Sequence, residues 1–134
     1  MKLLLLLAGW LLCVSAASAK PDPRAAQIHA LHQKILAKQK TLDAQTANPL
    51  FVAAGGTKDA KRIYTNILQE SKQVLVTLDQ LSPAKSGDAT QVTLVGELLD
   101  KETGLYDQAT AVISQNQDYI ERLRKSQPTK AKTP

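Results

Sequence analysis

The sequence predicts an all-α fold, an elongated antiparallel bundle of three long helices, and two observations support this. Apolar residues recur at helical spacing in three long segments, and no segment of any length alternates apolar and polar residues as a strand does. The connections between these segments are short, which favours antiparallel packing of consecutive helices.

The first helix is expected from Arg24 to Thr46. Asp22 precedes it and is placed to stabilise its start, where a carboxylate is favoured. The Asn48-Pro49 pair ends it, because proline disfavours a helical conformation in the residue before it. Its apolar face consists of Ile28, Leu31, Ile35 and Leu42.

The second helix is expected from Thr57 to Leu81. Thr57 belongs to the residue types that cap helix starts, and the Ser82-Pro83 pair ends the pattern. The apolar stripe of this helix is broad and consists of Ile63, Tyr64, Ile67, Leu68, Val74, Leu75, Leu78 and Leu81.

The third helix is expected from about Asp88 to Lys125, and its apolar stripe is wide enough for contact with two neighbours. Gly104 lies within it, and a glycine inside a helix costs about 1 kcal/mol relative to alanine. The apolar phase is the same on both sides of Gly104, so we expect one continuous helix. A break near Gly104 would instead give a four-helix bundle.

A continuous third helix would be longer than its partners. It would extend about 57 Å, against about 35 Å for each of the other two helices. About 20 Å of its apolar stripe would therefore need another cover. The sequence offers two covers: Leu50, Phe51 and Val52 in the first connection, or a second copy of the protein.

Residues 1–19 have the pattern of a cleaved secretory signal peptide. Lys2 precedes an apolar run, Leu3 to Val14, that is shorter than the about 20 residues needed to span a bilayer. Small residues at Ala17 and Ala19 predict cleavage after Ala19; an uncleaved N-terminal anchor is the alternative. We therefore expect a periplasmic or secreted protein with a single helical-bundle domain at residues 20–125.

The positions of the Cys, Trp and Met residues limit the chemistry of the mature chain. The only Cys, Trp and Met all fall within residues 1–19, so the mature chain has no thiol for a disulfide, a nucleophile or a metal site. The chain also lacks an Asn-x-Ser/Thr sequon. Together these features favour a bacterial envelope protein, stabilised by packing alone.

Basic charge is concentrated at the C-terminal end. Residues 20–121 contain eleven Lys and Arg against twelve Asp and Glu, a net charge of −1, whereas residues 122–134 contain no acid. The basic residues of this end are Arg122, Arg124, Lys125, Lys130 and Lys132. Residues 126–134 are polar and are expected to form a disordered tail. Such a tail suits an acidic partner or weak contact with an anionic lipid surface, and we expect no nucleic-acid binding.

His29 and His32 are the only histidines, and their spacing places both near one helix face. No Asp or Glu lies between Arg24 and Thr41, so a helical metal site would lack its usual carboxylate. His32 follows Ile28 by one turn and is expected at the edge of the apolar face, with His29 in solvent. The alternative is an adventitious copper, nickel or zinc contact at this pair; we expect no cofactor.

Glu102 and Asn116 occupy positions within the apolar stripe of the third helix. A polar residue in such a seam lowers stability but fixes register and the number of partners. The alternative is that both lie at the edge of the stripe and reach water.

The sequence contains no phosphate-binding loop and no arrangement typical of a catalytic triad, so we expect a protein that is not an enzyme. We expect an exported helical protein that acts by binding another envelope protein or a second copy of itself, as coiled-coil helices do. The alternatives are a carrier of a small ligand or metal ion within the bundle, and electrostatic association with an anionic envelope surface.

Overall fold

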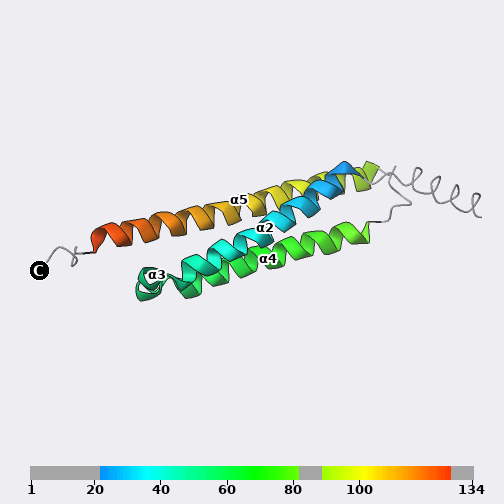
Figure 1. Ribbon diagram of the computed structural model, residues 1–134. Coiled ribbons are helices and arrows are strands. Elements are labelled where there is room, and N and C mark those ends of the chain that lie inside the picture. Colours follow the sequence, from blue (N-terminus) through cyan, green and yellow to red (C-terminus); the bar gives the residue numbers. More distant parts are fainter. Residues whose placement is uncertain (1–21, 82–88, 128–134) are drawn as a thin grey trace, which may run out of the picture.

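The computed structural model describes residues 22–81 and 89–127, and these form an all-α structure (Figure 1). Its helices are α2 (Pro23–Ala47), α3 (Pro49–Ala53), α4 (Thr57–Gln80) and α5 (Ala89–Ser126). None of the residues in these two ranges belongs to a strand. The predicted signal peptide, the start of the third helix at Asp88, and Lys130 and Lys132 lie outside the described residues.

The three long helices form an elongated bundle, as predicted (Figure 1). The chain reverses direction between α2 and α4 and again between α4 and α5, so consecutive long helices are antiparallel. The first and third long helices, α2 and α5, are therefore parallel to each other. Hydrogen bonds from Arg24 to the Val92 carbonyl and from Gln45 to the Ile113 carbonyl both join residues 68 positions apart, which shows that this pairing keeps one register.

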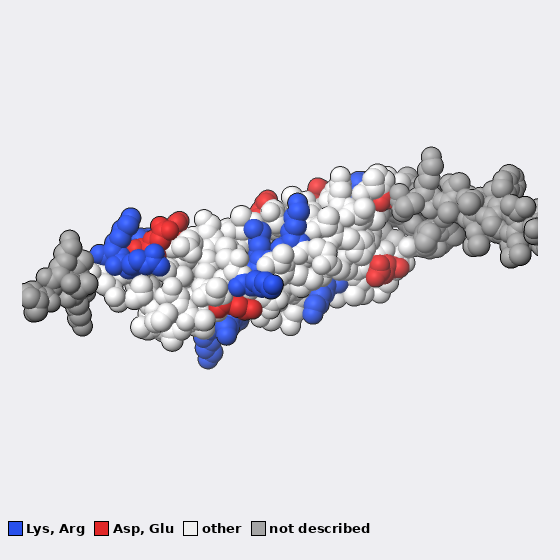
Figure 2. All heavy atoms as spheres, in the orientation of Figure 1, with Lys and Arg blue, Asp and Glu red and all other residues white. Residues whose placement is uncertain are grey.

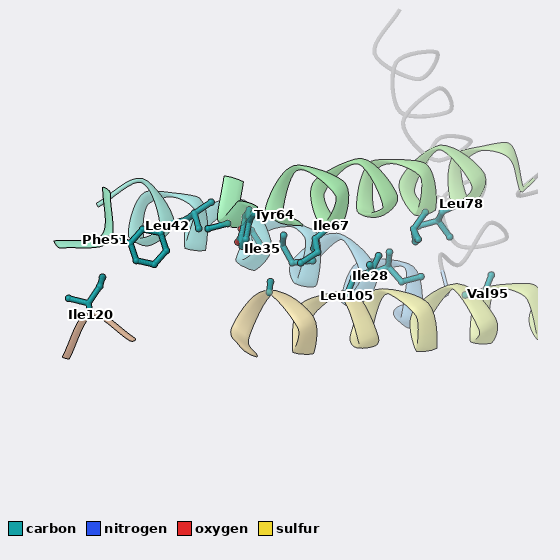
Figure 3. Packing of buried hydrophobic residues seen from close by; sticks show 13 residues of the cluster. Ile28, Ile35, Leu42, Phe51, Tyr64, Ile67, Leu78, Val95, Leu105 and Ile120 are labelled. Carbon is teal, nitrogen blue, oxygen red and sulfur yellow. The ribbon is translucent and has the colours of Figure 1, made fainter. Parts of the chain in front are cut away.

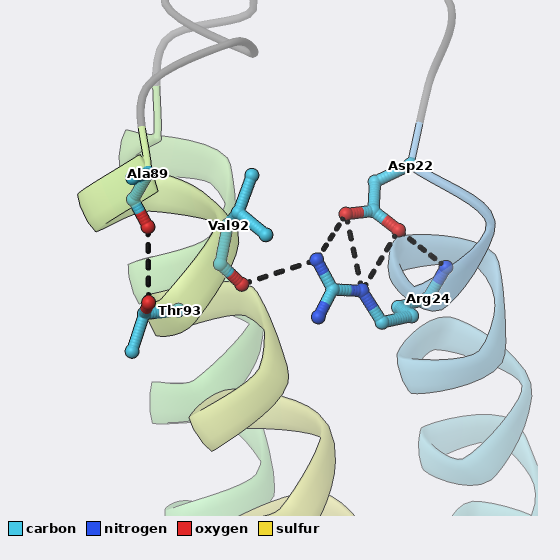
Figure 4. Close-up of polar contacts among 5 residues, drawn as sticks. All are labelled: Asp22, Arg24, Ala89, Val92 and Thr93. Atoms are coloured by element: carbon cyan, nitrogen blue, oxygen red, sulfur yellow. Dashed lines mark hydrogen bonds and ion pairs between the residues drawn. The ribbon is translucent and has the colours of Figure 1, made fainter.

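Asp22 and Arg24 organise the start of α2 (Figure 4). A side-chain oxygen of Asp22 accepts a hydrogen bond from the backbone N–H of Arg24 at 2.9 Å and thereby caps the helix. The Arg24 guanidinium forms an ion pair with Asp22 at 2.7 Å and also donates to the Val92 carbonyl at 3.1 Å. One side chain thus connects the α2 cap to the first turns of α5.

The connection between α2 and α4 contains the short helix α3, which the periodicity did not predict. The Asn48 side chain accepts a hydrogen bond from the Leu50 N–H at 3.0 Å, so the residue that ends α2 also caps α3. Gly55 then adopts a φ of 80°, a left-handed conformation that favours glycine. The expectation that Thr57 caps α4 is wrong: the cap position is Gly56, and the Thr57 hydroxyl donates to the Thr46 carbonyl at 3.0 Å instead.

The third long helix, α5, is continuous through Gly104, so the break that would give a four-helix bundle does not occur. Part of its expected overhang is covered by α3. Phe51 is 3 % exposed and packs edge-on against Tyr119, with ring centroids 6.0 Å apart. Ile120 is buried in the same region (Figure 3). The predicted contact of this connection with the third helix is therefore confirmed for Phe51, whereas Val52 is exposed.

The core follows the length of the bundle as a single apolar cluster (Figure 3). Within each long helix, the separations between its members are three or four residues or sums of such steps, as expected for one helix face. Its buried members are Ile28, Ile35, Leu42, Phe51, Ala60, Tyr64, Ile67, Val74, Leu78, Val95, Leu105, Ala109 and Ile120.

Replacing Ile35, which is fully buried, with alanine leaves a cavity between the helices. We expect the Ile35→Ala variant to lose about 2–5 kcal/mol of unfolding free energy, measured by urea denaturation. Val76→Ala is the control, because Val76 is 47 % exposed and its truncation should change stability by less than about 0.5 kcal/mol. Equal losses of unfolding free energy in the two variants would contradict the burial of Ile35 in the core.

Gly104 is a site where alanine should stabilise the protein. A Cβ added there meets no described atom within 4 Å, and the backbone is helical, so Gly104→Ala should raise the unfolding free energy by about 0.5–1 kcal/mol. At Gly96 the added Cβ would lie 3.1 Å from the Arg24 guanidinium, so Gly96→Ala should gain less. Thermal unfolding of both variants tests this; destabilisation by Gly104→Ala would mean that α5 is not continuous.

Candidate functional site

Three polar side chains meet in the middle of the core, one from each long helix. His32 of α2 and Ser71 of α4 are in contact, with 2.7 Å between the imidazole Nδ1 and the hydroxyl Oγ. The same hydroxyl forms a short hydrogen bond with Oε1 of Glu102 of α5. We refer to His32, Ser71 and Glu102 as the polar triplet. It joins all three long helices at one level of the bundle.

The polar triplet is almost completely shielded from solvent. Ser71 and Glu102 are 0 % exposed and His32 is 6 % exposed. The second carboxyl oxygen of Glu102, Oε2, is buried and has no hydrogen-bond partner among the described residues. A buried carboxylate with an unsatisfied oxygen is costly, so the protonation state of Glu102 matters for stability.

Burial shifts the pKa values of both ionisable members. It raises the pKa of Glu102 above its ordinary value, and the hydrogen bond from Ser71 opposes this in part. It lowers the pKa of His32, and the nearby charges of His29 and Lys72 lower that pKa further. Both shifts favour the uncharged form of the side chain.

The helix pattern explains why these residues are buried. His32 lies between Ile28 and Ile35 on the apolar face of α2, and Ser71 lies between Ile67 and Val74 on that of α4. Placing His32 at the edge of the apolar face was wrong: its position is in the core, because α4 and α5 both pack against that face.

Of the two alternatives for Glu102, the structure shows the seam position: the side chain is in the core and does not reach water. Asn116 is half-buried and donates a hydrogen bond to the Gln45 side chain at 3.3 Å. Gln45 in turn donates to the Ile113 carbonyl at 2.9 Å. Glu102 therefore contacts α4 and Asn116 contacts α2, so both polar positions of α5 have a partner within one chain.

Ser71 is the functional candidate that the sequence reasoning missed. One feature of the sequence could have indicated it. The apolar stripe of Tyr64, Ile67, Val74 and Leu78 lacks an apolar residue at one helical position, and Ser71 occupies that position. In a nucleophilic triad the imidazole lies between the hydroxyl and the carboxylate. Here the hydroxyl lies between the other two groups, so the geometry is that of a hydrogen-bond relay.

The expectation that His29 is in solvent is confirmed, since its side chain is exposed on the outside of α2. His29 and His32 therefore point into different surroundings. Over residues 22–81 and 89–127, no group of three or more His, Cys, Asp or Glu side chains is arranged to hold a metal ion.

The basic residues at the end of α5 form a second candidate site, which we call the basic end: Arg122, Arg124 and Lys125. All three side chains are exposed, and Figure 2 shows Lys and Arg side chains gathered at this end of the bundle beside acidic ones. The Arg122 guanidinium lies 5.9 Å from the centroid of the Tyr119 ring. Arg124 and Lys125 lie in the last turn, where cations interact favourably with the helix dipole. The basic end follows Ile120, the last buried residue of α5.

A comparison of the chain with models of known protein families, with characterised proteins and with solved structures found no match. Among the helices that the structure describes, none combines the length and apolarity needed to cross a membrane. The described residues form an elongated all-α bundle with a buried polar triplet and a basic helix end.

Removing the Ser71 hydroxyl should destabilise the bundle. In Ser71→Ala both His32 and Glu102 lose their described partner, and we expect a loss of about 1–3 kcal/mol of unfolding free energy in urea denaturation. Ser114→Ala makes the same chemical change at an exposed position of α5 and should be within about 0.5 kcal/mol of the wild type. If both variants are as stable as the wild type, the hydroxyl does not bridge the two side chains.

Proposed function

We propose that this protein acts without catalysis, by binding an acidic surface of another envelope protein through the basic end of α5. The observation that carries this proposal is the position of the basic end. Arg122, Arg124 and Lys125 are exposed at the end of α5, beyond the last buried residue of the helix.

The chain concentrates positive charge at this point. No Asp or Glu follows Glu121 in the sequence, while Lys130 and Lys132 add two further cations after the helix. The rest of the chain after the expected signal peptide is close to neutral, so an acidic partner would be attracted mainly to this end. Complementary charge of this kind speeds association and selects partners.

A bundle suits this role because it presents the basic end on a well-supported helix. Phe51 and Tyr119 pack together one turn before Arg122, and the Arg122 guanidinium lies against the Tyr119 ring. Residues held by packing lose less conformational freedom when they bind than residues on a free chain. Export to the envelope remains the expectation from residues 1–19 and is part of the proposal.

The test is a charge-reversal variant, Arg122→Glu/Arg124→Glu/Lys125→Glu. The purified protein is immobilised and incubated with the envelope fraction of the cells that produce it, and retained proteins are identified by mass spectrometry. We expect the wild type to retain an acidic protein. The affinity of this protein for the variant should be lower by roughly tenfold or more, because each reversed charge should cost about 0.5–1 kcal/mol of binding free energy. The same binding should weaken at high salt.

The matched control is Lys40→Glu/Lys58→Glu/Lys61→Glu, which reverses three exposed charges on other helices. It should retain the partner at the wild-type level. Retention of the same proteins by the basic-end variant would contradict the proposal. Vesicles of anionic lipid distinguish the alternative: binding to them that needs the basic end, without any protein partner, would favour association with an anionic surface.

A further inference from the structure

We propose that His32, Ser71 and Glu102 form a buried proton-binding site that makes the stability of the helix bundle depend on pH. The site lies at the level where all three long helices meet, so a change in its charge acts on the packing of the whole bundle. This property is independent of the binding proposed for the basic end.

The number of protons in the polar triplet follows from its two contacts. Nδ1 of His32 and Oε1 of Glu102 both contact the Ser71 hydroxyl, and each contact needs one proton to be a hydrogen bond. The hydroxyl supplies only one of them. The second proton must belong either to the Glu102 carboxyl or to Nδ1 of His32.

Two arrangements satisfy both contacts with no buried charge, and in both Glu102 is protonated and His32 is neutral. In one, Nδ1–H of His32 donates to the Ser71 hydroxyl, which donates to Oε1 of a Glu102 carboxylic acid protonated at Oε2. In the other, Oε1 of the Glu102 carboxylic acid donates to the Ser71 hydroxyl, which donates to an unprotonated Nδ1 of His32. If the carboxyl loses its proton and Nδ1 carries one, the hydrogen bonds survive, but a negative charge is buried beside the unpartnered Oε2. If both residues are protonated, a positive charge is buried on His32.

The charged groups around the triplet do not neutralise these states. On α2, His29 lies one turn from His32, and on α4, Lys72 follows Ser71; both disfavour a charged His32. On α5, Lys101 precedes Glu102, but its ammonium is paired at 4.0 Å with Glu70 of α4 on the exposed surface. The electroneutral arrangements, with Glu102 protonated and His32 neutral, are therefore the favoured ones.

The two residues make stability change with pH in opposite directions. The pKa of Glu102 is raised in the folded protein, so its contribution is present below about pH 4.5, its ordinary value, and is lost as pH rises through the folded pKa. The pKa of His32 is lowered, so its contribution is present above 6.5 and is lost as pH falls through the folded pKa. The triplet therefore penalises the folded state in alkali through Glu102 and in acid through His32.

Two variants separate these effects: Glu102→Gln is isosteric and mimics the protonated carboxyl, and His32→Asn removes the imidazole. Urea unfolding of each is compared with the wild type from about pH 4 to about pH 8. The unfolding equilibrium constant of the wild type should rise relative to Glu102→Gln by up to about tenfold for each pH unit above about 4.5. Relative to His32→Asn, it should rise by up to about tenfold for each pH unit below about 6.5.

Glu97→Gln makes the same chemical change at an exposed position of α5 and serves as the matched control. The quantity compared is the ratio of the wild-type unfolding equilibrium constant to that of each variant. The proposal would be overturned if the ratios for Glu102→Gln and His32→Asn did not change with pH, or changed only as much as the ratio for Glu97→Gln. Opposite pH trends in the two variants would support it, because a merely structural role would lower stability by the same factor at every pH.

The wild-type protein provides a second measurement that needs no substitution in the core. NMR of the histidine rings should show His32 neutral well below pH 6.5, and the exposed His29 of the same helix serves as the reference signal. A His32 ring that titrates like a free histidine, with a midpoint of about 6.5, would overturn the proposal even if both core variants failed to fold.

Discussion

The contact of one buried hydroxyl with an imidazole and a carboxyl is the constraint on which the register of this bundle depends. Apolar faces pack with similar energy at several offsets, whereas a displaced polar group in a core loses its partners. If α4 or α5 moved by a turn, Glu102 would lose Ser71, and if α2 moved by a turn, His32 would lose Ser71. The polar triplet thus selects one arrangement from those that the apolar stripes alone would allow.

Hydrogen bonds at the two ends of α2 also restrict the register of the helices. Arg24 and Gln45 both donate to main-chain carbonyls of α5, and each donor is 68 residues from its partner, Val92 or Ile113. The parallel pair of helices is therefore tied at both ends and in the middle. The acceptors at both ends are backbone carbonyls, so these hydrogen bonds do not depend on the α5 side chains. The central contact does depend on the side chain of Glu102.

Periodicity was sufficient to predict the three long helices, their approximate ends and most of the core, because apolar spacing reports directly on which face is buried. It could not place His32 or detect Ser71, since a polar residue in an apolar stripe reads as an interruption. Whether such interruptions face one another depends on the relative register of three helices, which no single helix specifies. The five residues of α3 are too few to show a period.

The unbroken course of α5 has a mechanical consequence. From Val92, where Arg24 is bound, to Ile120 beside α3, this one helix extends about 42 Å. A hydrogen-bonded helix resists compression and stretching along its axis far better than a loop of equal length. The C-terminal end of α5 therefore lies at a set distance from the point where α2 begins.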